Sequence, residues 1–365
     1  MGFRQAYAVI IFPNLRVWLF KPMSFFRLRV AELANVLCLG EMLVDWVSTK
    51  PGEELDVATA FTKAAGGAPA NVAVGLARQG VKAAFIGRIS KDAFGKWLKK
   101  TLDDEGVDTA GVVLDGEAQT RMAYVVTLAN GDRKLAEFSN ISVADTRLEP
   151  ADLREQQFSD ARALHFGSIS MICDPAAAAT RAAINLALKH KLLISFDPNV
   201  RLGLWNSEEV CRNTILSTLK FAHLVKINLD ELEFLSGSRE FSAAETLRQE
   251  HNIPLLIITL DAQGSLISCQ SGQKIIAGFE IDFVEATGAG DGFVSGLLLG
   301  LLEALSTAAD KRQAIAKLSI EQLSEIALRA NAVGALACTR AGAIPALPSA
   351  SEVKLFLQRH TAKPS

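Results

Sequence analysis

The stretch Thr287-Gly288-Ala289-Gly290-Asp291-Gly292-Phe293 leads directly into an apolar run at 294–302. Glycines allow consecutive backbone N–H groups to converge, and the start of a helix carries a partial positive charge. The turn therefore predicts a cradle for an anion such as a phosphoryl group. Asp291 falls where the helix begins, so it is either a helix cap or a general base beside the bound anion, and the local sequence leaves both interpretations open.

Short apolar runs typical of buried strands alternate with helical patterns over most of the chain. Strands are expected at 36–40, 83–87, 163–166, 192–196, 224–227 and 255–259, and helices at 72–78, 175–189, 208–221, 229–235, after Asp291 and at 320–337. This alternation predicts an α/β fold with a doubly wound, mostly parallel sheet flanked by helices. Ligands bind beyond the carboxyl ends of the strands in such a sheet.

Two stretches interrupt the alternation, at about 43–65 and 120–142. The second contains alternating apolar and polar residues on both sides of Ala129-Asn130-Gly131-Asp132, and an Asn-Gly pair between such segments is a strong hairpin signal. We expect the two stretches to form a small β-sheet that projects from the main sheet as a lid.

Composition narrows the class of protein. The 365 residues are 49% hydrophobic, and a net charge of −2 provides no basic field for nucleic acid, so a small metabolite is the expected partner. No run approaches the roughly 20 apolar residues that a membrane span needs. The five cysteines are widely spaced and odd in number, which argues against a disulfide framework or a zinc cluster and favours the reducing cytoplasm.

Residues 1–34 differ from the rest because they hold five Lys or Arg and a single acid, Glu32. We expect them to be a basic extension outside the fold, with an organelle-targeting presequence as the alternative. The main domain is expected at 35–350, followed by a tail at 351–365.

Three further motifs lie at the ends of expected strands or the start of a helix. Gly66-Gly67-Ala68-Pro69-Ala70-Asn71 combines a glycine turn with an amide that can both donate to and accept from sugar hydroxyls, although Asn71 could simply cap a helix. Asp197-Pro198-Asn199-Val200-Arg201 brings two acceptors and a cation to the ligand edge of the sheet. Asn228 and Glu231 share one face of a helical turn, where they either hold water on Mg²⁺ or cap the helix.

Other nucleotide and hydrolase motifs are absent. Phe293 occupies the place of the third glycine of a dinucleotide fingerprint, and no G-K-[ST] of a P-loop occurs in the chain. G-x-S-x-G is missing too, so the sequence does not indicate a Ser-His-Asp hydrolase.

In chain order, six motifs resemble the ribokinase-like (PfkB) carbohydrate kinase family over about 35–350. They are Gly66–Ala73, Asp197–Arg201, Asn228–Glu231, Thr259–Gly264, Ala286–Asp291 and Gly342–Pro345. Within the family the similarity is strongest to fructokinases, through Gly40–Asp45, His165–Ser170, Arg201–Trp205 and Gly342–Pro348.

The resemblance implies transfer of the γ-phosphoryl group of ATP to a primary hydroxyl of a sugar, with D-fructose as the expected acceptor. It implies Asp291 as the general base and the backbone of Gly288, Ala289 and Gly290 as the anion hole. It implies contacts to the sugar from Asp45, Gly66, Gly67, Asn71 and Arg201, and to ATP from Asn228, Glu231, Thr259, Gly264, Thr287 and Asn331. Mg²⁺ would be held by Asn228 and Glu231 through water, and a homodimer would form through the lid.

The chain departs from the family pattern at three places. Glu285-Ala286 replaces the usual Asp-Thr, whose acid commonly helps to bind a monovalent cation, so potassium activation through Glu285 is in question. Gly292 replaces the usual Ala or Thr, which weakens the helix start slightly. Ser139-Asn140-Ile141-Ser142 stands where fructokinases commonly carry an Arg. Alternatives therefore stay open: a kinase for ribose or 2-keto-3-deoxygluconate, or a non-catalytic kinase-like binding protein.

Overall fold

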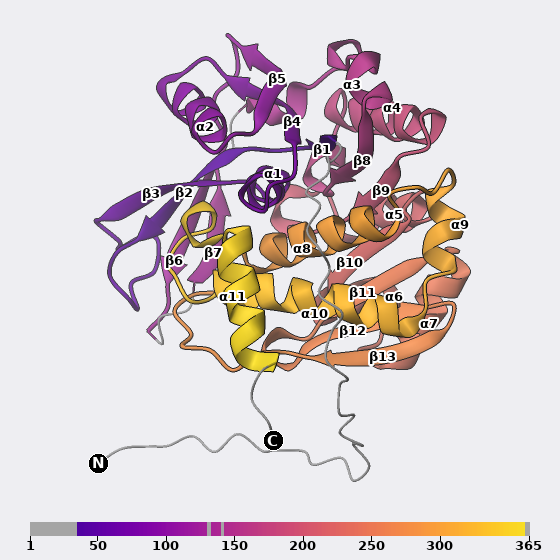
Figure 1. The fold of residues 1–365 in the computed structure, drawn as a ribbon. Coiled ribbons are helices and arrows are strands. Elements are labelled where there is room, and N and C mark those ends of the chain that lie inside the picture. The colour runs from indigo at the N-terminus through magenta and orange to yellow at the C-terminus, as the bar shows by residue number, and fades with distance from the viewer. Residues whose placement is uncertain (1–34, 130–132, 140–141, 362–365) are drawn as a thin grey trace, which may run out of the picture. The chain divides into compact units, whose positions relative to one another are not determined.

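A nine-stranded sheet forms the centre of the computed structural model, which describes residues 35–129, 133–139 and 142–361 (Figure 1). Its strand order is β13-β12-β11-β10-β9-β8-β1-β4-β5, and all neighbours are parallel except β11–β12 and β12–β13. The strands are β1 (Asn35–Leu39), β4 (Ala83–Ser90), β5 (Asp108–Asp115), β8 (Ala161–Phe166), β9 (Leu193–Phe196), β10 (Leu224–Asn228), β11 (Leu255–Thr259), β12 (Gly264–Cys269) and β13 (Gly272–Ala277).

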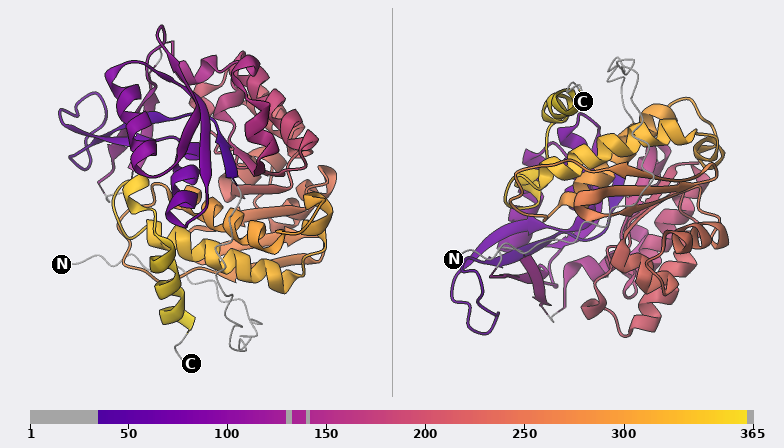
Figure 2. Two further views of the ribbon diagram at one scale, coloured as in Figure 1. Left: turned by 45° about the horizontal axis from the view of Figure 1, so that its top comes forward. Right: turned by 90° about the horizontal axis from the view of Figure 1, so that it is seen from below.

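Helices cover both faces of this sheet (Figure 2). They are α1 (Ala68–Arg78), α2 (Ala93–Asp104), α3 (Glu155–Ser159), α4 (Ala176–Lys189), α5 (Glu208–Leu219), α6 (Leu229–Ser236), α7 (Phe241–Glu250), α8 (Ala289–Ala304), α9 (Lys311–Ala316), α10 (Ile320–Ala337) and α11 (Ala350–Thr361). Successive strand side chains point to opposite faces, so Val36 and Cys38 pack with α1, α8 and α10, whereas Leu37 and Leu39 pack with α4 to α7. The predicted α/β fold class is confirmed.

A second sheet of four strands forms the lid, in the order β3-β2-β6-β7. Its strands are β2 (Leu43–Ser48), β3 (Phe61–Gly66), β6 (Met122–Thr127) and β7 (Arg133–Phe138). They fall within the two stretches that interrupt the βα alternation, which confirms the predicted lid sheet. The turn at 130–132 and residues 140–141 lie outside the described residues.

Two helix starts differ from the sequence prediction. Helix α1 begins at Ala68 rather than at residue 72, because Pro69 is compatible with a first helical turn, where its missing N–H group is not needed. Helix α8 begins at Ala289 with Gly288 at the capping position and no side-chain cap. Asp291 therefore lies inside the first turn, and the helix-cap interpretation of its side chain is wrong.

The C-terminal segment that follows residue 350 contains a helix, α11, and not only a tail. The ring of Phe356 packs edge-on against Phe279, with ring centroids 5.0 Å apart. Across 35–129, 133–139 and 142–361, none of the helices combines the length and apolar character needed to span a membrane.

Candidate active site

The turn before α8 has the geometry of an anion cradle. Gly288 has a left-handed backbone (φ 79°), and a Cβ atom there would lie 2.9 Å from Ala343 Cα, so only glycine fits. The N–H groups of Gly290 and Asp291 donate to no described residue, whereas the N–H of Ala289 donates to the carbonyl of Ala286 at 3.1 Å. The N–H group of Gly288 likewise donates to no described residue, so three donors at this helix start remain for an anion, whereas the predicted donor at Ala289 is already used.

Asp291 is buried beside this cradle, with 9% of its surface exposed. Its Oδ2 atom accepts a hydrogen bond of 2.8 Å from Asn71 Nδ2, across 220 residues of sequence. Burial raises the pKa of Asp291 to about 6, opposed by the hydrogen bond from Asn71 and by the charge of Lys226. A carboxylate with a pKa near 6 is mostly ionised at neutral pH and basic enough to accept a proton from a reacting hydroxyl.

Asn71, the second member of the pair, retains unused hydrogen-bonding capacity. It lies in the first turn of α1, and its Oδ1 atom is buried with no described donor. Buried polar atoms are normally paired, so this acceptor indicates a ligand hydroxyl. Asn71 lies inside α1, and its Oδ1 atom accepts from no N–H group of that helix, so the helix-cap interpretation of Asn71 is wrong, whereas its contact to a ligand stays a prediction.

Asp45 lies on the lid strand β2, against the glycine turn that precedes α1. A Cβ atom on Gly66 would lie 2.3 Å from Asp45 Oδ2, so the missing side chain makes room for this carboxylate. Burial raises the pKa of Asp45 to about 6, and the charges of Arg133 and Arg201 oppose this rise. Asp45 therefore lies close enough to Arg201 to be affected by its charge, and the contact of Asp45 to a sugar stays a prediction.

Gly67 and Glu41 fix the same turn, and the sequence analysis missed Glu41. Gly67 has φ 110°, and a Cβ atom there would lie 2.5 Å from the carbonyl oxygen of Glu41. The Glu41 side chain accepts from the N–H of Ala68 at 3.0 Å and so caps α1 from a distance in sequence. Burial raises the pKa of Glu41 to about 7. An acid directly after a buried strand was the signal that could have identified it.

Lys226 and Asp197 form a buried ion pair that the sequence analysis also missed. The Nζ atom of Lys226, on β10, lies 3.1 Å from Asp197 Oδ2 at the end of β9, and the two side chains are only 9% and 4% exposed. Burial works to lower the pKa of Lys226, but the surrounding carboxylates, Asp197 first, hold it above its ordinary value. A lysine inside an apolar strand was the signal for this pair.

Asn228 and Glu231 form a reciprocal capping box at the start of α6. Asn228 Oδ1 accepts from the N–H of Glu231 at 2.8 Å, and Glu231 Oε2 accepts from the N–H of Asn228 at 2.9 Å. Glu231 Oε1 accepts from the N–H of Val200 at 2.8 Å. The helix-cap interpretation is therefore correct for this pair. Each oxygen keeps a lone pair, so the residues also suit a hydrated Mg²⁺ held through water.

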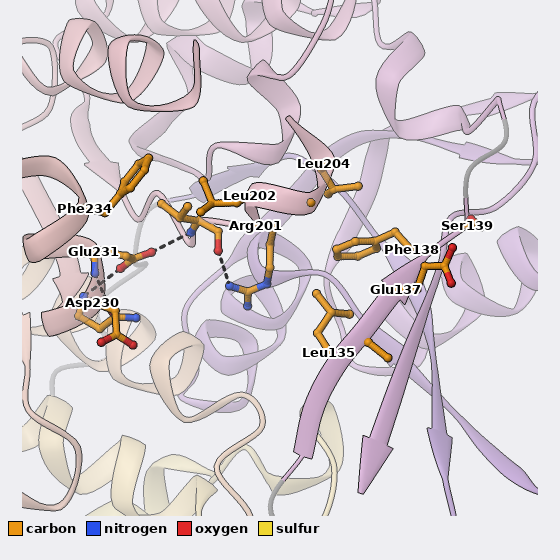
Figure 3. Close-up of a pocket in the computed structure, with 14 residues that line it drawn as sticks. Leu135, Glu137, Phe138, Ser139, Arg201, Leu202, Leu204, Asp230, Glu231 and Phe234 are labelled. Carbon is orange, nitrogen blue, oxygen red and sulfur yellow. Dashed lines mark hydrogen bonds between the residues drawn. The ribbon is translucent and has the colours of Figure 1, made fainter. Parts of the chain in front are cut away.

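Arg201 lines a cavity of about 700 Å³ between the lid and α6 (Figure 3). Figure 3 shows its guanidinium between Asp230 and Glu231 on one side and Leu135 and Phe138 of β7 on the other. Arg201 Nη1 donates to its neighbour's carbonyl, Val200 O, at 3.0 Å. Asp291 and Asn71 do not line this cavity. Of the residues predicted for the site, Arg201, Asn228 and Glu231 line this cavity.

The residues expected at the nucleotide end have mainly structural contacts. Thr259 Oγ1 donates to Ile227 O at 3.4 Å, and Thr287 is partly exposed in the anion turn. A Cβ atom on Gly264 would lie 2.1 Å from the carbonyl oxygen of Ile276. The amide of Asn331 donates to Ile276 O and Ala277 O at 3.0 and 3.1 Å, which fixes β13 against α10. Their contacts to a nucleotide stay predictions.

Glu285 is tied to the lid. Its Oε1 atom lies 2.6 Å from Arg133 Nη1 on β7, and its Oε2 atom accepts from the N–H of Gly342 at 3.1 Å. The charge of this carboxylate is therefore already compensated by a guanidinium. In the part of the chain that the structure describes, no group of three or more His, Cys, Asp or Glu residues is arranged to hold a metal ion.

Comparison with known proteins agrees with this geometry. Residues 33–350 match the model of the pfkB family carbohydrate kinases. Probable fructokinase-4 of Arabidopsis thaliana is 38% identical over 328 residues, which cover 90% of this chain and 98% of the relative.

Two solved structures are similar along nearly their whole length. A fructokinase with bound ATP from Xylella fastidiosa has a TM-score of 0.79 and 30% identity, covering 90% of this chain and 99% of that one. A fructokinase double mutant from Vibrio cholerae O395, bound to fructose, ADP and a potassium ion, has a TM-score of 0.75 and 30% identity, covering 89% and 98%. Sequence, fold and cradle geometry lead to one conclusion: the chain belongs to the PfkB family of carbohydrate kinases and is an ATP-dependent sugar kinase.

Proposed function

We propose that the protein phosphorylates D-fructose with Mg-ATP to give fructose 6-phosphate and ADP. The observation that carries the proposal is the buried carboxylate of Asp291 in the first turn of α8, which accepts from Asn71 of α1. The N–H groups of Gly290 and Asp291 in the same turn donate to no described residue. The proposed base and the proposed anion-binding N–H groups thus lie in the same first turn of α8. The similarity to fructokinases supports fructose as the acceptor.

The transfer requires positioning and charge stabilisation rather than covalent chemistry by the protein. The sugar hydroxyl attacks the γ-phosphorus, its proton passes to Asp291, and the bond to the bridging oxygen of ADP breaks. The N–H groups of Gly290 and Asp291 stabilise the negative charge of the transferring group. Asn71 Oδ1 and Asp45 accept hydrogen bonds from other hydroxyls of the sugar, and the lid excludes water, which would otherwise compete as the acceptor.

Metal ions enter the proposal in two different ways. Asn228 and Glu231 would hold Mg²⁺ through its water ligands, and the ion would supply positive charge to the phosphates of ATP. Glu285 does not fit a site for a monovalent cation, because Arg133 already compensates its charge. We therefore propose a kinase that does not depend on potassium.

The experiment is a coupled assay of ADP release from Mg-ATP with fructose, glucose, ribose and 2-keto-3-deoxygluconate. Turnover that requires fructose supports the proposal. Turnover with only another sugar refutes fructose as the acceptor, whereas no turnover with any of the four refutes the proposed reaction and favours the binding-protein alternative. Asp291→Asn serves as the control for turnover by a contaminating kinase.

A further inference from the structure

The buried ammonium of Lys226 faces the anion cradle, and nothing in the proposed reaction has so far used it. A Cβ atom on Gly290 would lie 3.2 Å from Lys226 Nζ, so the ammonium lies directly against the bare backbone of the cradle. Substituting any larger residue for Gly290 would displace the ammonium. Lys226 therefore belongs to the candidate active site, because its buried ammonium lies against a glycine of the anion cradle.

Lys226 has more donors than its partners use. An ammonium carries three N–H donors, and among the described residues only Asp197 Oδ2 accepts one, at 3.1 Å. The remaining donors of this nearly buried cation find no acceptor in the part of the protein that the structure describes, an arrangement that is costly unless a ligand completes it.

Asp197 holds the ammonium in this place. The parallel register of β9 with β10 sets Phe196 opposite Val225, so Asp197, the first residue after β9, lies beside Lys226 within β10. The other oxygen of Asp197 accepts from the N–H of Asn199 at 3.2 Å, which fixes the carboxylate. An ion pair with no further role is weak evidence for stability, since a well-packed apolar pair serves as well.

We propose that Lys226 is a catalytic residue whose ammonium binds the γ-phosphoryl group of ATP during transfer, with Asp197 as its positioning residue. This inference rests on the proposed phosphoryl transfer, but not on fructose as the acceptor. The ammonium neither gains nor loses a proton in the step. It donates to the γ-phosphoryl oxygens from one side while the N–H groups of the cradle donate from another, so charge is stabilised as the bond to ADP breaks and the bond to the sugar forms.

The test compares binding of two nucleotides. ADP and AMP-PNP, a non-hydrolysable ATP analogue that carries a γ-phosphoryl group, are titrated calorimetrically with Mg²⁺ into the full-length protein and its variants. Lys226→Met is expected to weaken AMP-PNP at least tenfold and to change ADP less than threefold. In the coupled assay its kcat falls at least 100-fold with little change in the KM for the sugar. Lys226→Arg is expected to recover part of both losses.

Two further variants separate this role from a structural one. Lys226→Met leaves Asp197 buried and unpaired, which destabilises the fold; the double variant Lys226→Met/Asp197→Asn removes that carboxylate charge and is expected to recover thermal stability but not AMP-PNP affinity. Arg121→Met breaks another buried pair, with Asp145, whose side chains are 5% and 4% exposed. It is expected to lower stability without changing the ratio of AMP-PNP to ADP affinity.

The outcomes are distinct. Equal weakening of ADP and AMP-PNP in Lys226→Met, or a double variant with wild-type kcat, would overturn the assignment of Lys226. Wild-type protein that transfers phosphate to a sugar other than fructose would refute the proposed acceptor while the nucleotide comparison still tests Lys226. Wild-type protein that binds neither nucleotide would overturn both.

Discussion

The substitution Asp291→Asn is expected to make the protein more stable and almost inactive at the same time. Burial raises the pKa of this carboxyl from its ordinary 3.8 to about 6. One pH unit corresponds to about 1.4 kcal/mol, so the folded protein carries a cost of roughly 3 kcal/mol for the ionised carboxylate above pH 6. The replacement amide brings a buried N–H₂ group without an evident acceptor, which costs about 1–2 kcal/mol. The net expectation is a gain of about 1–2 kcal/mol.

This gain depends on pH in a definite direction. Because the pKa is higher in the folded than in the unfolded chain, the folded protein binds more protons between about pH 4 and 6, and the wild type loses stability as pH rises through that window. The charge cost at pH 5 is roughly half of its value at pH 7.5. The variant is therefore expected to unfold at about the same temperature as the wild type at pH 5, and about 1.5–3 °C higher at pH 7.5.

Thermal unfolding at both pH values, together with the coupled kinase assay, checks this reasoning. Loss of the general base is expected to lower kcat by about 100- to 10,000-fold. The matched control is Asp104→Asn on α2, an exposed acid paired with Lys100, which should change neither activity nor the pH dependence of stability. A variant that unfolds below the wild type at pH 7.5, or one that keeps its kcat, would refute the assignment of Asp291 as a buried, ionised base.

Three other predictions concern the same site. The kcat/KM for the sugar is expected to fall as pH drops through about 6, because Asp291 must be ionised to take the proton, and a pH–rate profile between 5 and 8 measures it. Gly288→Ala should lower the free energy of unfolding by about 2 kcal/mol or more and remove most of the activity, since both backbone strain and Ala343 oppose a side chain there. Gly106→Ala is the control, at a similar φ with open space around it. It should lower the free energy of unfolding in urea by only about 1 kcal/mol and leave the activity unchanged. Replacing KCl by NaCl should change kcat less than twofold, because Arg133 already compensates the charge of Glu285; a large activation by potassium would contradict this. Arg133→Gln should raise the KM for the sugar, because it removes the ion pair that ties the lid to Glu285.

The sequence predicted those features that local pattern determines. The apolar run at 255–259 and the helical pattern at 175–189 can be recognised from their periods alone, and the strand β11 and the helix α4 follow them closely. The Asn-Gly turn between two alternating segments likewise predicted the lid, because turn chemistry is local.

Features that depend on strand register or on packing between distant segments were not predictable. Lys226 is one polar residue in an apolar run, and only the pairing of β9 with β10 brings Asp197 beside it. The ion pair of Glu285 with Arg133 likewise requires the position of the lid over the anion turn. Asn331 shows the opposite difference. The sequence predicted a contact to ATP, whereas in the structure its side-chain amide donates to the backbone of β13.

The short junction at Gly67 has a consequence for engineering. Strand β3 ends at Gly66 and helix α1 begins at Ala68, so one residue separates the lid from the helix that carries Asn71. Asp45 belongs to the lid, whereas Asn71 and Asp291 belong to the main domain. A chimera that receives residues 43–65 and 120–142 from a relative would therefore exchange the sugar contact proposed for Asp45, while the recipient would keep the contact proposed for Asn71 and its own machinery for phosphoryl transfer.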